Sequence, residues 1–227
     1  MQERYDKIAE MRRLGVEPFA TRFDENTTLA SLHAAAEGQE LPDVEQVQSA
    51  AKNAVRIAGR LMTFREHGRI SFGTLQAGAK PQEGEVPERI QLCFLRGYTQ
   101  IAGLQIPQDM DTEPEKVHER FWKKLLDLGD YCGVVGDLFR TKHGELTILV
   151  HELHFLSKAL RPLPEKWHGL TDRATRYRQR NLDLIANAET RARFWASQSS
   201  KASMMGFERS FRAARRRSVA TNVFFCT

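Results

Sequence analysis

A change in the spacing of apolar residues at Val55 sets the strongest limit on how this chain can fold. From that residue onward, apolar side chains recur at every second position, as in Val55, Ile57 and Leu61. A period of two places successive side chains on opposite faces of a β-strand, whereas a helix repeats about every 3.6 residues. The central part of the chain is therefore predicted to be a sheet with one apolar face.

Turn and loop residues divide this central part into five expected strands. The first strand begins at Val55, and the other four cover about Ile70–Gln76, Arg89–Phe94, Tyr131–Arg140 and Leu146–Leu156. Between the third and fourth strands, Val117, Phe121 and Leu125 recur at every fourth position. This spacing predicts a helix from about Glu115 to Leu128, with these three side chains lined up on one face.

Five strands with one helix between the third and the fourth is the order of an OB-fold, a small Greek-key barrel that binds oligonucleotides. We therefore expect an α+β chain that is mainly β, with a five-stranded OB-fold barrel over residues 51–157. Residues 1–50 form a predicted helical extension, in which Ile8 and Leu14 share a helical face and Thr28 caps a second helix from Leu29. Other small α+β domains can produce the same order.

Alternation also identifies side chains that leave the barrel core. If Leu75 points inward, Phe72 lies on the outside of the second strand among polar neighbours. By the same argument Gln91 and Glu145 point outward, and Arg65 lies in the predicted turn between the first two strands. An exposed ring can stack on an unpaired base while polar groups contact its edge. Single-stranded RNA is therefore the predicted ligand of this face.

An alternative for Phe72 stays open at this point. The ring can instead plug the mouth of the barrel or pack under the N-terminal helices, because an aromatic side chain is used for packing as often as for binding. Periodicity alone does not separate the two.

No motif predicts catalysis or a metal site. His151 and His154 are three residues apart on a strand, which sends their rings to opposite faces, whereas the metalloprotease zinc motif needs a spacing of four on a helix. Gly133 and Gly136 lie within a predicted strand and are expected to ease its curvature. We therefore predict no catalytic residues and no metal ligands.

The charge and the cysteines limit which classes of protein the chain can belong to. The net charge of +5 comes from the last 35 residues, which carry 7 basic and 1 acidic side chains, so charge alone is a weak argument for nucleic-acid binding. Cys93, Cys132 and Cys226 form no Cys-x-x-Cys pair, which favours reduced thiols. Without a secretory signal or a long apolar run, we expect a cytoplasmic protein with no membrane span.

A long stretch after the last strand carries a family resemblance. Residues 157–187 read SKALRPLPEKWHGLTDRATRYRQRNLDLIAN, which closely resembles the linker and first catalytic-domain helix of bacterial lysyl-tRNA synthetases. GRLMTFREHGRISFGTLQ (59–76), RIQL (89–92) and DLGDYCGVVGDLFRTKHGELTI (127–148) resemble the anticodon-binding domain of the same family. The resemblance covers about residues 4–193. The related aspartyl and asparaginyl enzymes share the OB-fold but not this linker.

The resemblance implies a role for each outward residue. The family's base-stacking aromatic falls on Phe72, and its glutamine that contacts the central uridine of the anticodon falls on Gln91. The glutamate that helps to read the same base falls on Glu145, and the arginine between the first two strands falls on Arg65. The implied partner is the tRNA for lysine, bound through its anticodon loop. The full-length family charges this tRNA in a reaction that uses ATP and Mg²⁺, and it forms homodimers.

The chain departs most strongly from the family pattern at its end. After about Phe194 it lacks the family's dimer-interface segment and the two later motifs that bind ATP. The resemblance therefore implies a tRNA-binding portion of a lysine–tRNA ligase, with no cofactor of its own, that does not aminoacylate alone. Smaller departures are the long loop 77–87, the segment 173–175 and Asn181.

These departures define the expected end of the chain. We expect a linker and the first catalytic-domain helix over residues 158–193, and an aberrant basic tail over residues 194–227 that follows from a disrupted reading frame. Two alternatives stay open: a genuine basic tail that binds RNA, and a standalone regulatory module that binds other single-stranded RNA.

Overall fold

The computed structural model describes residues 2–38, 41–42, 54–77, 89–106, 114–163 and 172–205. The chain consists of two compact units, the first formed by Met1–Ala79 with Val86–Leu160 and the second by Lys80–Glu85 with Arg161–Thr227. Most of the predicted long loop 77–87, and the predicted tail after residue 205, lie outside the described residues.

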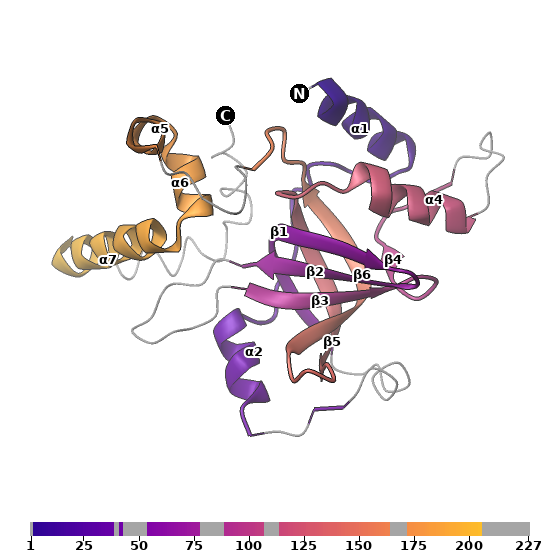
Figure 1. Cartoon of the computed structure of the whole chain (residues 1–227), viewed down its shortest axis with the longest axis horizontal. Coiled ribbons are helices and arrows are strands. Elements are labelled where there is room, and N and C mark those ends of the chain that lie inside the picture. The colour runs from indigo at the N-terminus through magenta and orange to yellow at the C-terminus, as the bar shows by residue number, and fades with distance from the viewer. Residues whose placement is uncertain are drawn as a thin grey trace. The chain divides into compact units, whose positions relative to one another are not determined.

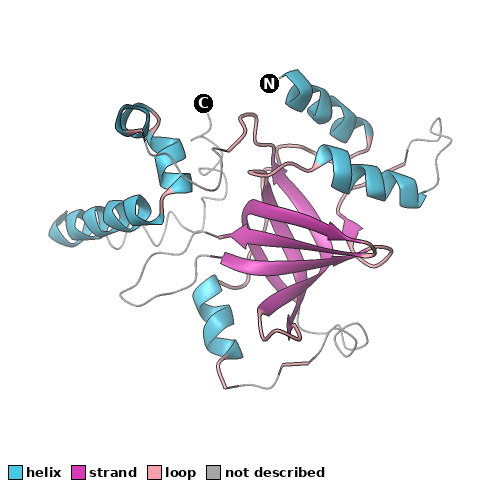
Figure 2. Cartoon of the chain, in the orientation of Figure 1, coloured by secondary structure: helices cyan, strands magenta, loops and turns pink. Residues whose placement is uncertain are grey.

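The first unit is built on six strands, most of them antiparallel (Figures 1 and 2). Their bounds are β1 (Val55–His67), β2 (Ile70–Gln76), β3 (Arg89–Leu95), β4 (Gln100–Ile101), β5 (Tyr131–Arg140) and β6 (Leu146–Ser157). They follow the order β3-β2-β1-β5-β6-β4, and β3 also pairs with β6 in parallel, so the five long strands close into a strand ring. The predicted α+β class is confirmed, and only the two-residue β4 was not expected.

The inner face of the strand ring holds the main core. Ile90, Leu92 and Phe94 of β3 are buried, as their alternation predicts, and Leu75 of β2 is fully buried. The inward prediction for β6 is confirmed as well, with Ile148 fully buried. Burying a Leu or Ile side chain contributes about 1.5–3 kcal/mol. This apolar lining is therefore what fixes the register of the strands, since a one-residue slip would turn it to solvent.

Two N-terminal helices pack on the ring, and both were predicted. Helix α1 (Gln2–Arg13) ends where Gly15 adopts a positive φ of 75°, which lets Val16 N donate to Met11 O at 2.9 Å. Helix α2 (Leu29–Ala36) is capped by Thr28, whose hydroxyl accepts from Ser31 N. Figure 1 shows α2 on the opposite side of the strands from α1 and α4.

The helix predicted at Glu115–Leu128 is shorter than expected. Helix α4 (Pro114–Arg120) continues as a single π-turn, η1 (Phe121–Leu125), where Leu126 N donates to Phe121 O at 3.1 Å. The chain then leaves the helix because Asp127 N donates instead to the side chain of Asp130. The predicted apolar face is confirmed, since Val117, Phe121 and Leu125 are all buried in the main core.

One extra residue in β1 changes the face that its later side chains occupy. Leu61 pairs with Leu75, but Thr63 pairs with Thr74, so Met62 forms a bulge. An extra residue in one strand reverses the alternation beyond it. Side chains that a strict period of two would turn inward after Leu61 therefore point outward.

The described part of the second unit is helical. It comprises α5 (Arg173–Arg178), α6 (Arg180–Ala186) and α7 (Ala188–Met205). Asp183 is fully buried and accepts hydrogen bonds from Arg176 Nε at 2.9 Å, from Arg180 and from Asn187. Within the predicted linker and first catalytic-domain helix of residues 158–193, the described residues form three helices, and α7 continues without a break past Phe194, where the tail was expected to begin.

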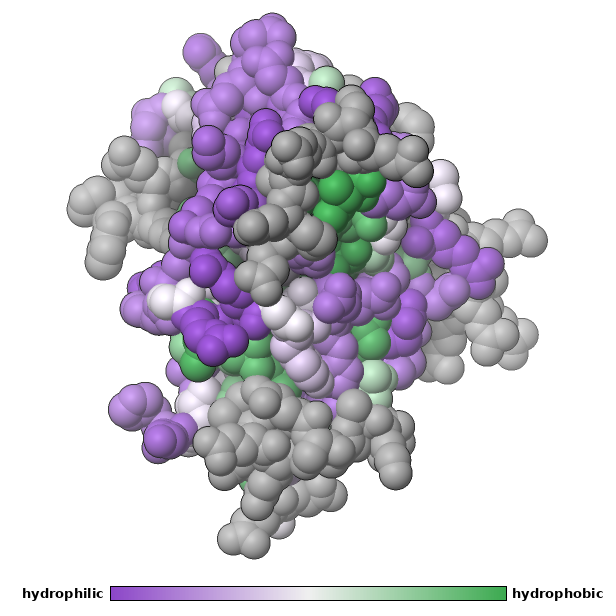
Figure 3. Space-filling view, turned by 90° about the vertical axis from the view of Figure 1, so that its right-hand side faces the viewer, coloured by the Kyte–Doolittle hydropathy of each residue, from purple (hydrophilic) through white to green (hydrophobic). Residues whose placement is uncertain are grey.

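The described residues on one face of the molecule are mainly polar. Hydrophilic residues dominate the face shown in Figure 3, with hydrophobic residues visible in gaps between them. Among the described helices, none combines the length and the apolar character needed to cross a membrane.

Candidate nucleic-acid interface

The outward side of β1, β2 and β3 carries two rows of side chains. We use "outer face" for these six residues: Thr63, Arg65, Phe72, Thr74, Gln91 and Cys93. In one row Arg65 lies opposite Phe72 and Phe72 opposite Cys93, and in the other Thr63 lies opposite Thr74 and Thr74 opposite Gln91. The three strands lie in front of β6 in Figure 1, so this side is turned toward the viewer. With ordinary strand spacings the rows cover about 10 Å by 7 Å, close to the size of one nucleobase.

Arg65 reaches the outer face through the bulge at Met62. The prediction that Arg65 lies in a turn is wrong, because β1 continues to His67 and the turn begins at Gly68. Arg65 pairs with Phe72, and its side chain is exposed. An arginine held on a strand beside an aromatic ring is placed to contact a phosphate or a base edge next to a stacked base.

Phe72 lies outside the main core but is half-buried. It packs against a small group of buried side chains that we name the outer apolar cluster: Cys93, Phe139 and Leu149. Its ring centroid is 6.4 Å from that of His67, at an interplanar angle of 57°. The structure therefore gives this ring apolar support from the strands, and it leaves part of the ring accessible.

Gln91 is half-buried, and its amide is held by a neighbouring strand. Thr147 Oγ1 donates to Gln91 Oε1 at 2.8 Å across the parallel pairing of β3 and β6. Among the described residues, no side chain or backbone group accepts from Gln91 Nε2. The amide thus has one anchored end, and its NH₂ group is available to a ligand.

Glu145 stands at the rim of this surface, on the turn between β5 and β6. The turn is fixed by two hydrogen bonds of 3.1 Å, from Thr141 N to Glu145 O and from Glu145 N to Thr141 Oγ1. The carboxylate is exposed. Its backbone lies close to the Gln91 anchor, since Glu145 O is 3.1 Å from Thr147 Oγ1.

Cys93, the strand neighbour of Phe72, has no part in nucleophilic chemistry. It is 1 % exposed, and burial raises its pKa to about 11. A thiol in this state acts as a small apolar side chain, since the thiolate is the reactive form. Its place here is to support the ring of Phe72.

The two histidines of β6 have different surroundings, as their spacing predicts. His151 Nε2 is 3.1 Å from Asp137 Oδ2, and its ring meets the ring of Tyr98 edge-on. His154 instead pairs with Glu152 at 2.9 Å and lies 5.1 Å from the ring of Phe23. Each ring is thus used in its own local contacts.

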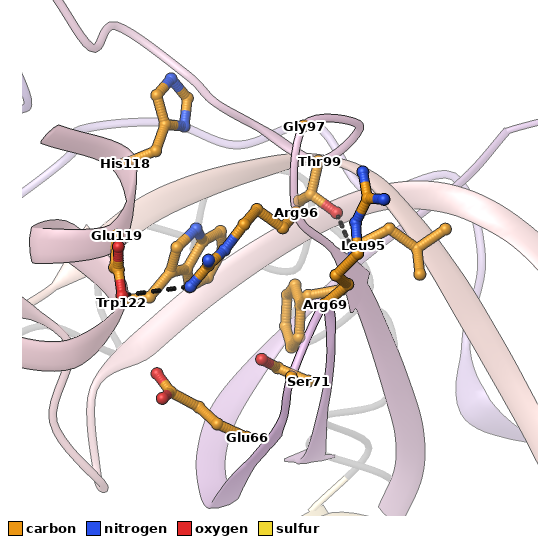
Figure 4. A pocket seen from close by; sticks show the side chains of 12 residues that line it. Glu66, Arg69, Ser71, Leu95, Arg96, Gly97, Thr99, His118, Glu119 and Trp122 are labelled. Atoms are coloured by element: carbon orange, nitrogen blue, oxygen red, sulfur yellow. Dashed lines mark hydrogen bonds and ion pairs between the residues drawn. The ribbon is translucent and has the colours of Figure 1, made fainter. Parts of the chain in front are cut away.

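A separate cavity lies between α4, the tip of the β1–β2 hairpin and the end of β3 (Figure 4). Its volume of about 40 Å³ suits a few water molecules and is too small for a base. One wall is Trp122, stacked on Phe64 with 6.0 Å between ring centroids. Another is the ion pair of Arg96 with Glu119 at 3.1 Å. This cavity is separate from the outer face, and Arg65, Phe72 and Gln91 do not line it.

Sequence reasoning missed two contributors to this site. Thr147 anchors Gln91, and Thr63 Oγ1 donates to its cross-strand neighbour Thr74 Oγ1 at 2.7 Å, within the row that also holds Gln91. The only sequence signal for Thr147 is a polar residue inside the otherwise apolar run LTILV. That signal is weak, because threonine is common in strands.

Comparison with known proteins identifies relatives of this chain. No family model matches it. It is 42 % identical over 194 residues to the lysine–tRNA ligase of Edwardsiella ictaluri, and 43 % identical over 194 residues to those of Salmonella arizonae and Salmonella newport. Each match covers 86 % of this chain and 33 % of the relative, so the chain spans about one third of the length of these relatives.

The relatives in these matches are aminoacyl-tRNA synthetases. Within that class it is a homologue of lysine–tRNA ligase over the 86 % of its length that is matched, and the resemblance predicted from the sequence is confirmed.

Proposed function

We propose that the first unit is an OB-fold that binds the anticodon loop of the tRNA for lysine. Arg65, Phe72, Gln91 and Glu145 are its proposed contacts. The observation that carries the proposal is their arrangement: three lie in adjacent rows of the outer face, and the fourth stands on the turn beside the Gln91 anchor. Homology to lysine–tRNA ligases supports tRNA as the partner.

The chemistry of these side chains complements uracil. The exposed part of the Phe72 ring offers a stacking surface, worth about 1–3 kcal/mol per base. The Gln91 amide can donate to the carbonyl O4 of uracil, and the Glu145 carboxylate can accept from its N3–H. Cytosine presents the opposite pattern at both atoms, a donor at N4 and an acceptor at N3. The exposed Arg65 guanidinium supplies a positive charge for the backbone.

We expect no ATP-dependent charging of tRNA by the 227-residue chain alone, because its sequence lacks the motifs that bind ATP and Mg²⁺ in the family it resembles. Incubation with lysine, ATP, Mg²⁺ and the tRNA tests this directly. Formation of lysyl-tRNA would contradict it.

Binding to short RNA hairpins tests the proposed specificity. Fluorescence anisotropy of the 227-residue chain is measured with an anticodon stem-loop that carries UUU, and with a matched stem-loop that carries UCU. We expect the UCU hairpin to bind at least about tenfold more weakly, because a reversed donor and acceptor leave polar groups unpaired. Equal affinities would favour a general single-stranded RNA-binding module.

A shortened chain tests the contribution of the basic end. A variant that ends after Arg193 lacks all of the excess positive charge. We expect the same preference for UUU and a similar salt dependence in both chains. A much shallower salt dependence for the shortened chain would show that the tail contacts RNA phosphates.

A further inference from the structure

The hydroxyl of Thr147 has two acceptors within reach and one proton to give. Thr147 Oγ1 lies 2.8 Å from Gln91 Oε1 and 3.1 Å from the backbone oxygen of Glu145. Thr147 is fully buried. A threonine hydroxyl is a single donor with two lone pairs, so it donates to one of these oxygens at a time.

The destination of this proton decides what Gln91 presents to a ligand. When Thr147 donates to Gln91 Oε1, the amide oxygen is occupied and the NH₂ group faces outward as a donor. If the amide were reversed, Gln91 Nε2 would donate to Thr147, whose own proton would then have to go to Glu145 O. The contact to Gln91 is the shorter of the two, which favours the donor-outward state.

We propose that Thr147 is a positioning residue that holds Gln91 with its NH₂ group outward and thereby sets the preference for uracil over cytosine. This inference rests on the proposed function, and it names a residue that acts through Gln91 without touching the RNA. The parallel pairing of Gln91 with Thr147 makes the arrangement possible. It places the two side chains next to each other on the same side of β3 and β6, the two strands whose pairing closes the strand ring.

Loss of the Thr147 hydroxyl is expected to change the discrimination between uracil and cytosine more than the affinity for the preferred RNA. An outward NH₂ group meets an acceptor at position 4 of uracil but a second donor at position 4 of cytosine. A Gln91 amide that is not anchored can turn over and accept from cytosine instead. Loss of the Thr147 hydroxyl therefore strengthens binding of the wrong base, while stacking on Phe72 continues to support both.

The experiment compares Thr147→Val with Thr147→Ser in the full chain. Valine keeps the shape and removes the hydroxyl, whereas serine keeps the hydroxyl and removes a methyl group. The readout is the ratio of dissociation constants for the UCU and UUU stem-loops. We expect Thr147→Val to lower this ratio about three- to tenfold, the equivalent of one neutral hydrogen bond, and Thr147→Ser to retain it. In a Gln91→Ala background, Thr147→Val should leave the ratio unchanged.

The outcomes separate this inference from the function on which it rests. No preference for UUU in the unmodified chain would overturn the proposed function. A ratio that falls in Gln91→Ala but stays unchanged in Thr147→Val would overturn the role of Thr147 alone. Thermal melting establishes that each variant folds. If Thr147→Val does not fold, Thr147→Ala, which also lacks the hydroxyl, replaces it.

Discussion

Arg65 and Phe72 are direct cross-strand neighbours on the outer face of the strand ring. They occupy the same face only because Met62 is an extra residue in β1. Without it, the alternation that turns Leu61 inward would also turn Arg65 inward, and a guanidinium would be buried without a partner in an apolar core. Burial of an unpaired charge is among the most costly changes a fold can suffer. The bulge thus allows one strand to supply both core residues and a binding residue.

Phe72 provides the most direct test of the outer face. We expect Phe72→Ala to weaken binding of the UUU stem-loop by about 1–3 kcal/mol, because a base loses its stacking partner. Fluorescence anisotropy measures the affinity, and urea denaturation measures the stability of the same protein.

Phe72→Leu is the matched control for packing. Leucine retains apolar contact with the outer apolar cluster but offers no aromatic face, so we expect stability close to that of the unmodified chain and affinity close to that of the alanine variant. If Phe72→Leu binds RNA normally, the ring serves packing only. A Phe72→Ala chain that does not fold would point the same way.

Local periodicity predicted most of the strand ring, and long-range pairing determined the rest. Strands β2 and β5 have the expected bounds because inward side chains such as Leu75 must alternate with outward ones. The bulge at Met62 is set by distant contacts, since Leu61 N donates to Asp130 O and Gly129 N donates to Leu61 O. No pattern within residues 55–67 reveals those partners, so the face of Arg65 was not predictable.

The same reasoning applies to the candidate site. Phe72 and Gln91 could be assigned to the outside from their own strands. The link to Thr147 exists only through the parallel pairing of β3 with β6, which joins residues 56 positions apart. A sequence pattern describes one strand at a time, and it carries no information about which strands meet.

The reaction rate of the Cys93 thiol measures how well the Phe72 side chain shields it from solvent. With a pKa of about 11, only about one thiol in a thousand is ionised near pH 8, and the sulfur is also shielded from solvent. We expect slow reaction of Cys93 with a disulfide reagent in the folded chain, and a reaction at least about tenfold faster in Phe72→Ala.

Cys132 is the internal control for this measurement, because it is buried in the main core and burial raises its pKa well above the ordinary value. Its reactivity should be the same in both proteins. Peptide mapping by mass spectrometry assigns the modified residue. Equal acceleration at both cysteines would indicate general unfolding instead of local exposure.

Asp183 stabilises the helices of the second unit through its hydrogen bonds. Burial raises the pKa of its carboxyl, but hydrogen bonds from Asn187 and Arg176 outweigh burial, so the pKa lies below the ordinary 3.8. A lowered pKa means that the contribution is present above about pH 4 and is lost as the pH falls through the folded-state value. We expect Asp183→Asn to speed hydrogen exchange in peptides from residues 173–190 about tenfold near neutral pH.

Glu189→Gln is the matched control for Asp183. Glu189 also pairs with an arginine, Arg193, but both side chains are largely exposed. Exposed pairs contribute little, so exchange should hardly change. Comparable acceleration in the two variants would show that burial of Asp183 has no special importance.

Lys158 ties the end of β6 to the turn that follows η1. Its buried ammonium lies 2.6 Å from Asp127 Oδ2, 2.8 Å from Asp130 Oδ2 and 2.6 Å from Leu125 O. Burial raises the pKa of Asp130, and the charge of Lys158 opposes that rise. We expect Lys158→Met to cost about 3–5 kcal/mol near pH 7, because it leaves the Asp130 carboxylate buried without its cation.

The pH dependence of this loss identifies the carboxyl responsible. Without Lys158 the pKa of Asp130 rises further, and a carboxyl with a raised folded-state pKa destabilises the fold progressively as the pH climbs through that value. The loss in urea denaturation should therefore be smaller near pH 5 than near pH 7, because protonation of Asp130, which removes the unpaired charge, becomes easier as the pH falls. A second substitution, Asp130→Asn, should abolish this difference between the two pH values.

Lys123→Met is the control for the loss of a lysine charge. It removes an ammonium that is about half exposed, and it should change stability little at either pH. An equal loss near pH 5 and pH 7 in Lys158→Met would mean that the cost comes from packing and not from the charge of Asp130.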